Sequence, residues 1–143
     1  MSARSKILDS LIVKLKQING TGNYSINLFN NVTKNNVFWD EVNDFPYVCA
    51  IAGFENREYL PGGFKWGYLT ITLRVYVRGE TPVEQLENVL VDIEKCIDAN
   101  RELAYDTGKE TTEIDIVSIV TDEGLLKPFG VGEVTLQVRY QVL

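Results

Sequence analysis

The feature that most constrains the fold is the strict alternation of apolar and polar residues in the segment 68–78, YLTITLRVYVR. Side chains at every second position of a β-strand lie on one face, so this pattern predicts a strand with one covered face. Its apolar face consists of Leu69, Ile71, Leu73, Val75 and Val77. The segment 133–142 alternates in the same way, with its inward face formed by Val134, Leu136, Val138, Tyr140 and Val142. The chain is therefore expected to build a sheet that packs through one face.

Two other segments have the period of a helix. Residues 3–18 place apolar side chains at steps of three and four, at Ile7, Leu8, Leu11, Ile12, Leu15 and Ile18. A second helix should begin at Thr81-Pro82 and run to about residue 102, with Glu84 completing a capping box. Its buried stripe is formed by Leu86, Val89, Leu90, Ile93 and Ile97. Both helices are amphipathic, as expected of helices that cover a sheet.

Three further strands complete the predicted sheet. Residues 23–29 form a short strand, residues 47–54 form a strand covered on both faces, and residues 113–121 form a strand with a bulge near Ile116-Val117. Short connections at 55–67 and 121–133 make neighbouring strands antiparallel. We therefore expect one α+β domain over residues 1–143, a mainly antiparallel sheet packed with an N-terminal helix and one long central helix.

Composition narrows the possible functions. The chain has 143 residues, a net charge of −6 and a pI of about 4.7, which argues against a surface that grips nucleic acid or an acidic membrane. The longest apolar run, residues 47–54, is too short to span a bilayer, and residues 1–17 lack the apolar centre of a secretory signal, so synthesis in the cytoplasm is expected. There is no histidine, and Cys49 and Cys96 are expected to be two buried, reduced thiols.

The segment 121–133, TDEGLLKPFGVGE, could be an acidic catalytic or metal-binding loop, or a connector that does no chemistry. The acidic residues Glu113, Asp115, Asp122 and Glu123 could be regarded as a site for Mg²⁺ or Ca²⁺, but their spacing brings no set of oxygens together. Asp122-Glu123-Gly124 is more simply a turn, in which glycine supplies the backbone angle. The sequence thus predicts no catalytic residue, no metal site and no cofactor, and hence no enzyme.

Both connections carry side chains that protein interfaces favour. The candidate partner or subunit interface comprises Arg57, Tyr59, Leu60, Phe64, Lys65 and Trp66 in the first connection and Leu125, Leu126, Lys127 and Phe129 in the second. Two interpretations stay open. These side chains either contact a partner or, for the aromatic residues, fold back as a small local core.

The whole chain resembles the tail terminator, or tail completion, proteins of long-tailed bacteriophages. The resemblance is carried by the opening amphipathic helix and by the segments FWDEVNDFPYVCAIAGFE, GYLTITLRVYV, TPVEQLENVLVDIEKCI and TDEGLLKPFGVGEVTLQVRYQV. It implies a structural virion protein of the tail and neck, assembled in the host cytoplasm. Such proteins form a ring, hexameric in the family, that caps the head-proximal end of the tail tube, ends tube polymerisation and offers a docking surface to head and neck proteins.

The partners implied by the resemblance are further copies of the chain, the tail tube protein and a neck or head-completion protein. Viral DNA would pass through the ring without specific binding, and acidic walls would repel its phosphates. The alternatives are another tail-tube or head-completion component, a small carboxylate-dependent enzyme and a cytosolic ligand-binding domain.

Overall fold

Strand β3 (Lys65–Arg78) is the central strand of a five-stranded sheet with the order β1-β2-β3-β7-β6. The computed structural model describes residues 2–143. The other strands are β1 (Val32–Thr33), β2 (Tyr47–Tyr59), β6 (Glu113–Thr121) and β7 (Phe129–Val142). Only the β1–β2 pair is parallel within the described part of the chain, so the sheet is mainly antiparallel, as the short connections predicted.

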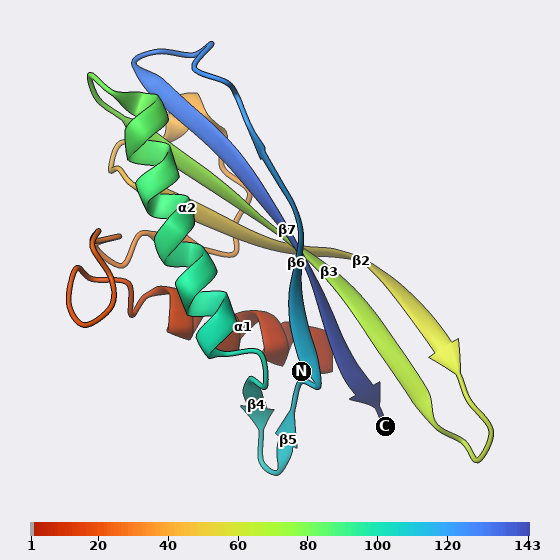
Figure 1. The fold of residues 1–143 in the computed structure, drawn as a ribbon. Coiled ribbons are helices and arrows are strands. Elements are labelled where there is room, and N and C mark those ends of the chain that lie inside the picture. The colour runs from red at the N-terminus through yellow and green to blue at the C-terminus, as the bar shows by residue number, and fades with distance from the viewer. Residues whose placement is uncertain (1) are drawn as a thin grey trace.

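Helices α1 (Ala3–Leu15) and α2 (Pro82–Ala99) cover the same face of this sheet (Figure 1). The expected inward residues of β3 and β7 share one core with the helices, and only Val142 among them is partly exposed. The predicted stripe of the second helix lies in this core too, formed by Leu86, Val89, Leu90, Ile93 and Ile97. This arrangement confirms the α+β class with two helices.

The opposite face of the sheet is covered over only part of its area. The segment 34–46, which contains the short 3-10 helix η1 (Trp39–Glu41), forms a second apolar cluster with the sheet around Val42, Cys49 and Tyr76. The Tyr76 hydroxyl donates a hydrogen bond of 2.6 Å to the Val37 carbonyl and fastens this segment to β3. Beyond the cluster the face stays open and presents polar residues of β3 and β7, among them Thr72, Thr135 and Gln137.

Several boundaries differ from the sequence-based expectation. The α1 helix ends at Leu15, and α2 ends at Ala99 before the hairpin of β4 (Ala104–Asp106) and β5 (Lys109–Glu110). The bulge in β6 is confirmed, because the pairing with β7 shifts register between Ile116 and Ser118.

The predicted strand at 23–29 is wrong. This segment forms a loop that makes one isolated bridge, Asn19 with Asn27, in the described structure. Its backbone N–H groups at Ser25 and Ile26 each donate a 2.8 Å hydrogen bond to the buried Asp92 carboxylate of α2. A side chain therefore satisfies donors that a neighbouring strand would otherwise satisfy, while the apolar side chains of the loop still pack inward.

The capping box predicted at Thr81 is also wrong, although the helix begins where it was expected. Thr81 precedes α2 and Pro82 occupies the first turn, but the Thr81 side chain makes no capping hydrogen bond. Its backbone angles, φ −122° and ψ 64°, lie away from the extended region in which a capping side chain points at the helix N–H groups. Proline at the start of the helix leaves one fewer N–H to satisfy.

Both strand connections are shorter than the sequence suggested. Strand β2 continues to Tyr59 and β3 begins at Lys65, so the first connection is residues 60–64. Strand β7 begins at Phe129, which leaves residues 122–128 as the second. Residues 55–59 lack apolar alternation because most of them are exposed, and they continue β2 only through pairing with β3.

Candidate assembly surfaces

The two candidate connections lie at opposite ends of the sheet. Strand β3 pairs with β7 along its whole length, from Lys65 opposite Val142 to Arg78 opposite Phe129. The connection 60–64 leads into the first of these ends, and 122–128 leads into the other (Figure 1). A strand of 14 residues separates the two ends by about 40 Å at about 3.3 Å per residue. One domain thus presents two distinct patches that face away from one another.

The first patch is the arm, which we define as residues 55–69 of β2, β3 and their connection. The arm projects beyond the helices in Figure 1. Tyr59 is 74% exposed, and Leu60 and Phe64 are exposed as well. The Lys65 ammonium lies 5.5 Å from the centre of the Tyr59 ring, which places these two side chains together. None of these four residues belongs to either apolar cluster, so the arm tip offers apolar surface that a local core does not use.

Trp66 lies on the other face of the arm. It pairs with Glu58 across the strands and is half-buried, and the Arg139 guanidinium stacks 4.2 Å from the centre of its ring. This stacking holds Trp66 against the sheet, so only part of the indole is available to a partner.

The second patch is the loop 122–128. Asp122 organises the loop, since its N–H donates to the Val131 carbonyl at 2.9 Å and its carboxylate accepts from the Leu126 N–H at 3.3 Å. Gly124 has a φ of 81°, as the turn interpretation of Asp122-Glu123-Gly124 requires. Leu125 is 83% exposed, Lys127 is exposed and Leu126 is half-buried.

Phe129 does not belong to the exposed part of that patch. It begins β7, and its ring centre lies 4.9 Å from that of Trp39 and 5.9 Å from that of Phe45. The Arg78 guanidinium lies 5.3 Å from the same ring centre. For Phe129 the geometry favours the local-core interpretation.

Sequence reasoning missed a third surface, the outer edge of the sheet. Strand β6 is an edge strand, and its Val117 and Val120 are 61% and 60% exposed. Ile119 and, on the neighbouring helix, Val91 are exposed beside it and line the same hollow. An apolar edge strand with unpaired backbone groups is a ready site for pairing with another chain. The run IVSIV could have signalled this surface, because strict alternation fails there, but only the strand order identifies β6 as an edge.

Two of the four acidic residues considered for metal binding are paired with a cation. Glu113 and Asp115 both accept hydrogen bonds from the Arg101 guanidinium. Among residues 2–143, no group of three or more potential metal ligands is found. The thiols of Cys49 and Cys96 are free and buried, and burial raises the pKa of both.

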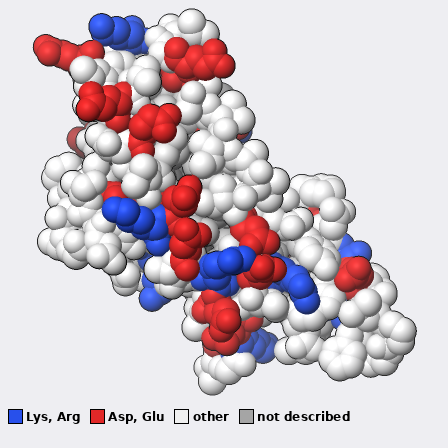
Figure 2. Space-filling model, in the orientation of Figure 1, with Lys and Arg blue, Asp and Glu red and all other residues white. Residues whose placement is uncertain are grey.

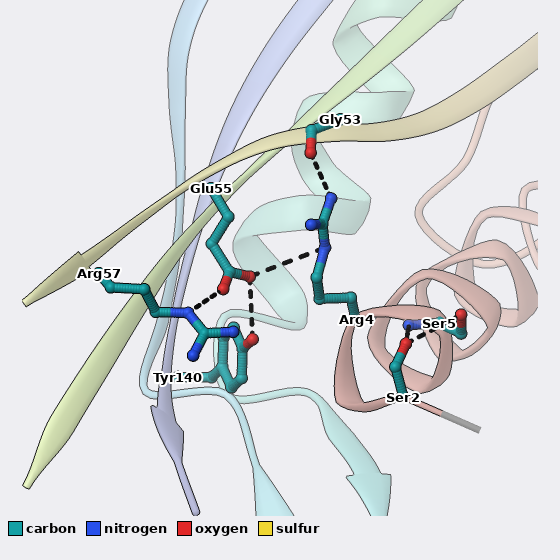
Figure 3. Close-up of polar contacts among 7 residues, drawn as sticks. All are labelled: Ser2, Arg4, Ser5, Gly53, Glu55, Arg57 and Tyr140. Carbon is teal, nitrogen blue, oxygen red and sulfur yellow. Dashed lines mark hydrogen bonds and ion pairs between the residues drawn. The ribbon is translucent and has the colours of Figure 1, made fainter.

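A buried ionic cluster connects the arm to α1 (Figure 3). The Glu55 side chain is only 4% exposed, accepts hydrogen bonds from Arg57 and from the Tyr140 hydroxyl, and lies 3.9 Å from Arg4. Arg4 also donates to the Gly53 carbonyl, next to the bulge between Ala52 and Glu55. Burial and the Glu55 carboxylate raise the pKa of Tyr140 to about 12. The cluster therefore fixes the base of the arm relative to the first turn of α1.

Charge is distributed unevenly over the surface. Figure 2 shows that acidic side chains predominate at the end of the molecule where α2 begins. Glu80, Glu84 and Lys127 lie together there around a shallow, largely apolar hollow. No helix among the described residues is long and apolar enough to cross a membrane.

Comparison with known proteins gives one consistent result. Residues 1–143 match the family described as Bacteriophage Tail Tube Terminator Protein. Tail tube terminator protein p142 of Escherichia phage T5 is 36% identical over 153 aligned positions, which cover 99% of this chain and 95% of that protein. A chain in the structure of the virion of a native gene transfer agent particle superimposes with a TM-score of 0.58 over 99% of this chain and 96% of that chain. At 9% identity, that likeness shows a shared fold alone.

Proposed function

The chain belongs to the bacteriophage tail tube terminator family, and from that premise we propose that six copies form a ring on the head-proximal end of the tail tube. The protein is a structural component of the virion tail and has a tail-terminating role; it is not an enzyme. In the proposed arrangement the ring ends tube polymerisation on one side. On its other side it offers a docking surface to neck or head-completion proteins.

The observation that carries the ring is the presence of two different free edges in one sheet. At one edge β6 is unpaired on its outer side over Glu113–Thr121. At the other edge β1 covers only Val48 and Cys49 of β2, which leaves residues 50–59 open within the described structure. Two edges of similar length can pair head to tail between neighbouring copies. A contact between unlike surfaces, repeated by rotation about one axis, closes a ring when the last copy meets the first.

The ends of the sheet supply the axial surfaces of the proposed ring. The arm and the loop 122–128 lie at opposite ends of β3, so copies joined edge to edge would present all arms on one side and all loops on the other. Tyr59, Leu60 and Phe64 offer apolar contacts on the first side, and Leu125 offers one on the second. We assign one side to the tail tube and the other to the neck.

The open face of the sheet suits passage of DNA without binding. Its polar residues Thr72, Thr135 and Gln137 carry no charge, and Arg74 is paired with Glu133 at 2.8 Å. Arg139 is a further cation on this face, and its guanidinium is stacked on the Trp66 ring. With a net charge of −6 on each chain, a ring would repel phosphate groups rather than hold them. In the proposal this face lines the channel and the helices face outward.

Electron microscopy and the mass of the particle in solution test the proposal together. The purified protein, alone and mixed with the cognate tail tube protein, should form rings of six copies that cap one end of each tube. A double variant, Val117→Lys with Val120→Lys, should prevent the ring because charged side chains on an edge strand oppose pairing. Val13→Lys is the matched control, since Val13 is equally exposed but lies on α1. A protein that stays monomeric with tubes and leaves their length unchanged would contradict the proposed function.

A further inference from the structure

A basic hollow lies between the first turn of α1, the β4–β5 hairpin, the end of β7 and the arm. Its volume is about 340 Å³. Four cationic side chains line it, those of Arg4, Lys6, Arg57 and Lys109, together with one carboxylate side chain among the described residues, Asp106. The chain as a whole has 20 acidic and 14 basic residues, so this local excess of positive charge opposes the overall balance.

The two arginines of the hollow share a single buried carboxylate. Glu55 accepts from Arg57 and lies 3.9 Å from the Arg4 guanidinium, while the Tyr140 hydroxyl donates to the same carboxylate at 2.9 Å (Figure 3). One negative charge therefore faces two positive ones. Both guanidinium groups remain more than one-third exposed, so their remaining N–H groups reach the hollow.

The charges around Lys6 also leave positive charge in the hollow without a partner. Lys6 pairs with Asp106 at 2.7 Å, so that carboxylate is already neutralised. Lys109 stands beside the pair in the next strand, is exposed and makes no ion pair with any described residue. The first turn of α1 contains no acidic residue, although the positive end of a helix dipole favours one there. Counting charged side chains alone, four cations thus face two carboxylates, those of Asp106 and Glu55, which leaves two positive charges in surplus.

We propose that this hollow binds a carboxylate-bearing segment of the protein that contacts the ring on the side of the arm. The axial location of that partner rests on the proposed function, whereas the chemistry of the site does not. Guanidinium groups bind carboxylates through paired hydrogen bonds, and an ammonium group adds a point charge beside them. The small size of the hollow and the net charge of −6 favour one or two acidic side chains over the backbone of a nucleic acid.

Lys109 is the residue to change, because its exposed side chain contributes charge to the hollow and makes no hydrogen bond or ion pair with a described residue. Lys109→Glu reverses the charge at this position, whereas Lys109→Arg keeps a positive charge there on a guanidinium group. Lys16→Glu makes the same change of net charge on exposed surface at the far end of α1, and therefore serves as the control. All variants should keep the thermal midpoint of the parent protein.

Binding is measured first with a blocked tetraglutamate peptide by two-dimensional NMR at low salt, with inorganic phosphate and a short oligodeoxythymidylate as competing probes. Resonances of Arg4, Arg57 and Lys109 should shift with the peptide. Lys109→Glu should weaken peptide binding about tenfold, which corresponds to about 1.4 kcal/mol. Lys109→Arg and Lys16→Glu should bind like the parent protein, and added salt should weaken binding in every case.

The outcomes separate this inference from the proposed function. Absence of peptide-induced shifts at the hollow, equal weakening by both charge-reversal variants, or binding of the oligonucleotide alone would each overturn the inference, whatever the ring does. Tube capping by the same variants is the second readout. Lys109→Glu should form rings but cap tubes about tenfold less tightly than Lys16→Glu, and equal capping would refute a partner contact at this hollow.

Discussion

Replacing Tyr140 with phenylalanine tests whether the buried ionic cluster holds the base of the arm. The Tyr140 side chain is only 1% exposed, and its hydroxyl donates to the Glu55 carboxylate at 2.9 Å. The substitution keeps the ring and its packing and removes only this donor. A hydrogen bond to a charged group contributes about 1.5–3 kcal/mol to stability, so the free energy of unfolding near pH 8 should fall by about that amount.

The same contact predicts how this difference changes with pH. Burial and Glu55 raise the pKa of Tyr140 from 10.0 to about 12. A raised pKa means that the stabilisation is complete below the pKa of the unfolded chain and is lost as the pH rises from about 10 through about 12. At about pH 11 the parent protein should have lost about 1.4 kcal/mol through this group, whereas the phenylalanine variant has no such group to titrate. The difference in the free energy of unfolding between the parent protein and the phenylalanine variant should therefore decrease as the pH rises.

Urea unfolding monitored by tryptophan fluorescence measures both free-energy differences. The two proteins are compared at equal concentration, because formation of the proposed ring would stabilise the folded chain. Tyr24, whose pKa is also raised to about 12 by burial, is present in both proteins and cancels in the comparison. A loss below about 0.5 kcal/mol near pH 8, or a gap that widens toward pH 11, would refute the reasoning.

Three other substitutions test the placement of the core and of the surface patches. Ile93 has no exposed surface in α2, so Ile93→Ala should lower the free energy of unfolding in urea by about 2–5 kcal/mol, whereas the exposed Val13→Ala should change it by less than about 0.5 kcal/mol. Phe64→Ser should leave the circular dichroism spectrum and thermal midpoint unchanged while reducing tube capping in electron micrographs; normal capping would exclude Phe64 from the contact. Phe129→Ser should lower the thermal midpoint, because its ring packs on Trp39, and an unchanged midpoint would show that this contact adds little.

The elements that sequence reasoning predicted well are those whose pattern is set by one covered face. The alternation at 68–78 and 133–142 identified the inward residues because β3 and β7 are paired on both sides and covered by helices on one face. The apolar stripe ending at Ile97 was equally clear because α2 lies along that face. These patterns depend only on neighbours in the sequence and on the presence of a core.

The failures involve contacts between residues distant in sequence. The segment 23–29 alternates like a strand, but its N–H groups bond to Asp92, more than sixty positions along the chain. Glu55 lies in a charged stretch that suggested exposed loop, yet the bulge after Ala52 turns it inward toward Tyr140. The edge position of β6 follows from strand order, which no local pattern contains.

That the ten candidate residues form an interface stays a prediction, but the structure shows which of their side chains are free to contact a partner. Exposure separates its members, since Tyr59 and Leu125 stay in solvent while Phe129 packs against two aromatic rings. An aromatic residue in a connection can contact a partner or pack in a local core. Phe129 packs locally because η1 lies over the start of β7, which the sequence pattern does not reveal.

The uninterrupted pairing of β3 with β7 restricts how this protein can change in size. The spacing between the arm and the loop 122–128 is set by the length of that ladder, 14 residues in each strand. Unless a bulge such as those in β2 and β6 absorbs it, one residue inserted into either strand would move every following side chain to the opposite face and expose the core. A ladder without bulges therefore changes length by two residues at a time and in both strands together, which corresponds to steps of about 7 Å. Related chains built on this sheet should differ in the separation of their two ends by multiples of that step, rather than continuously.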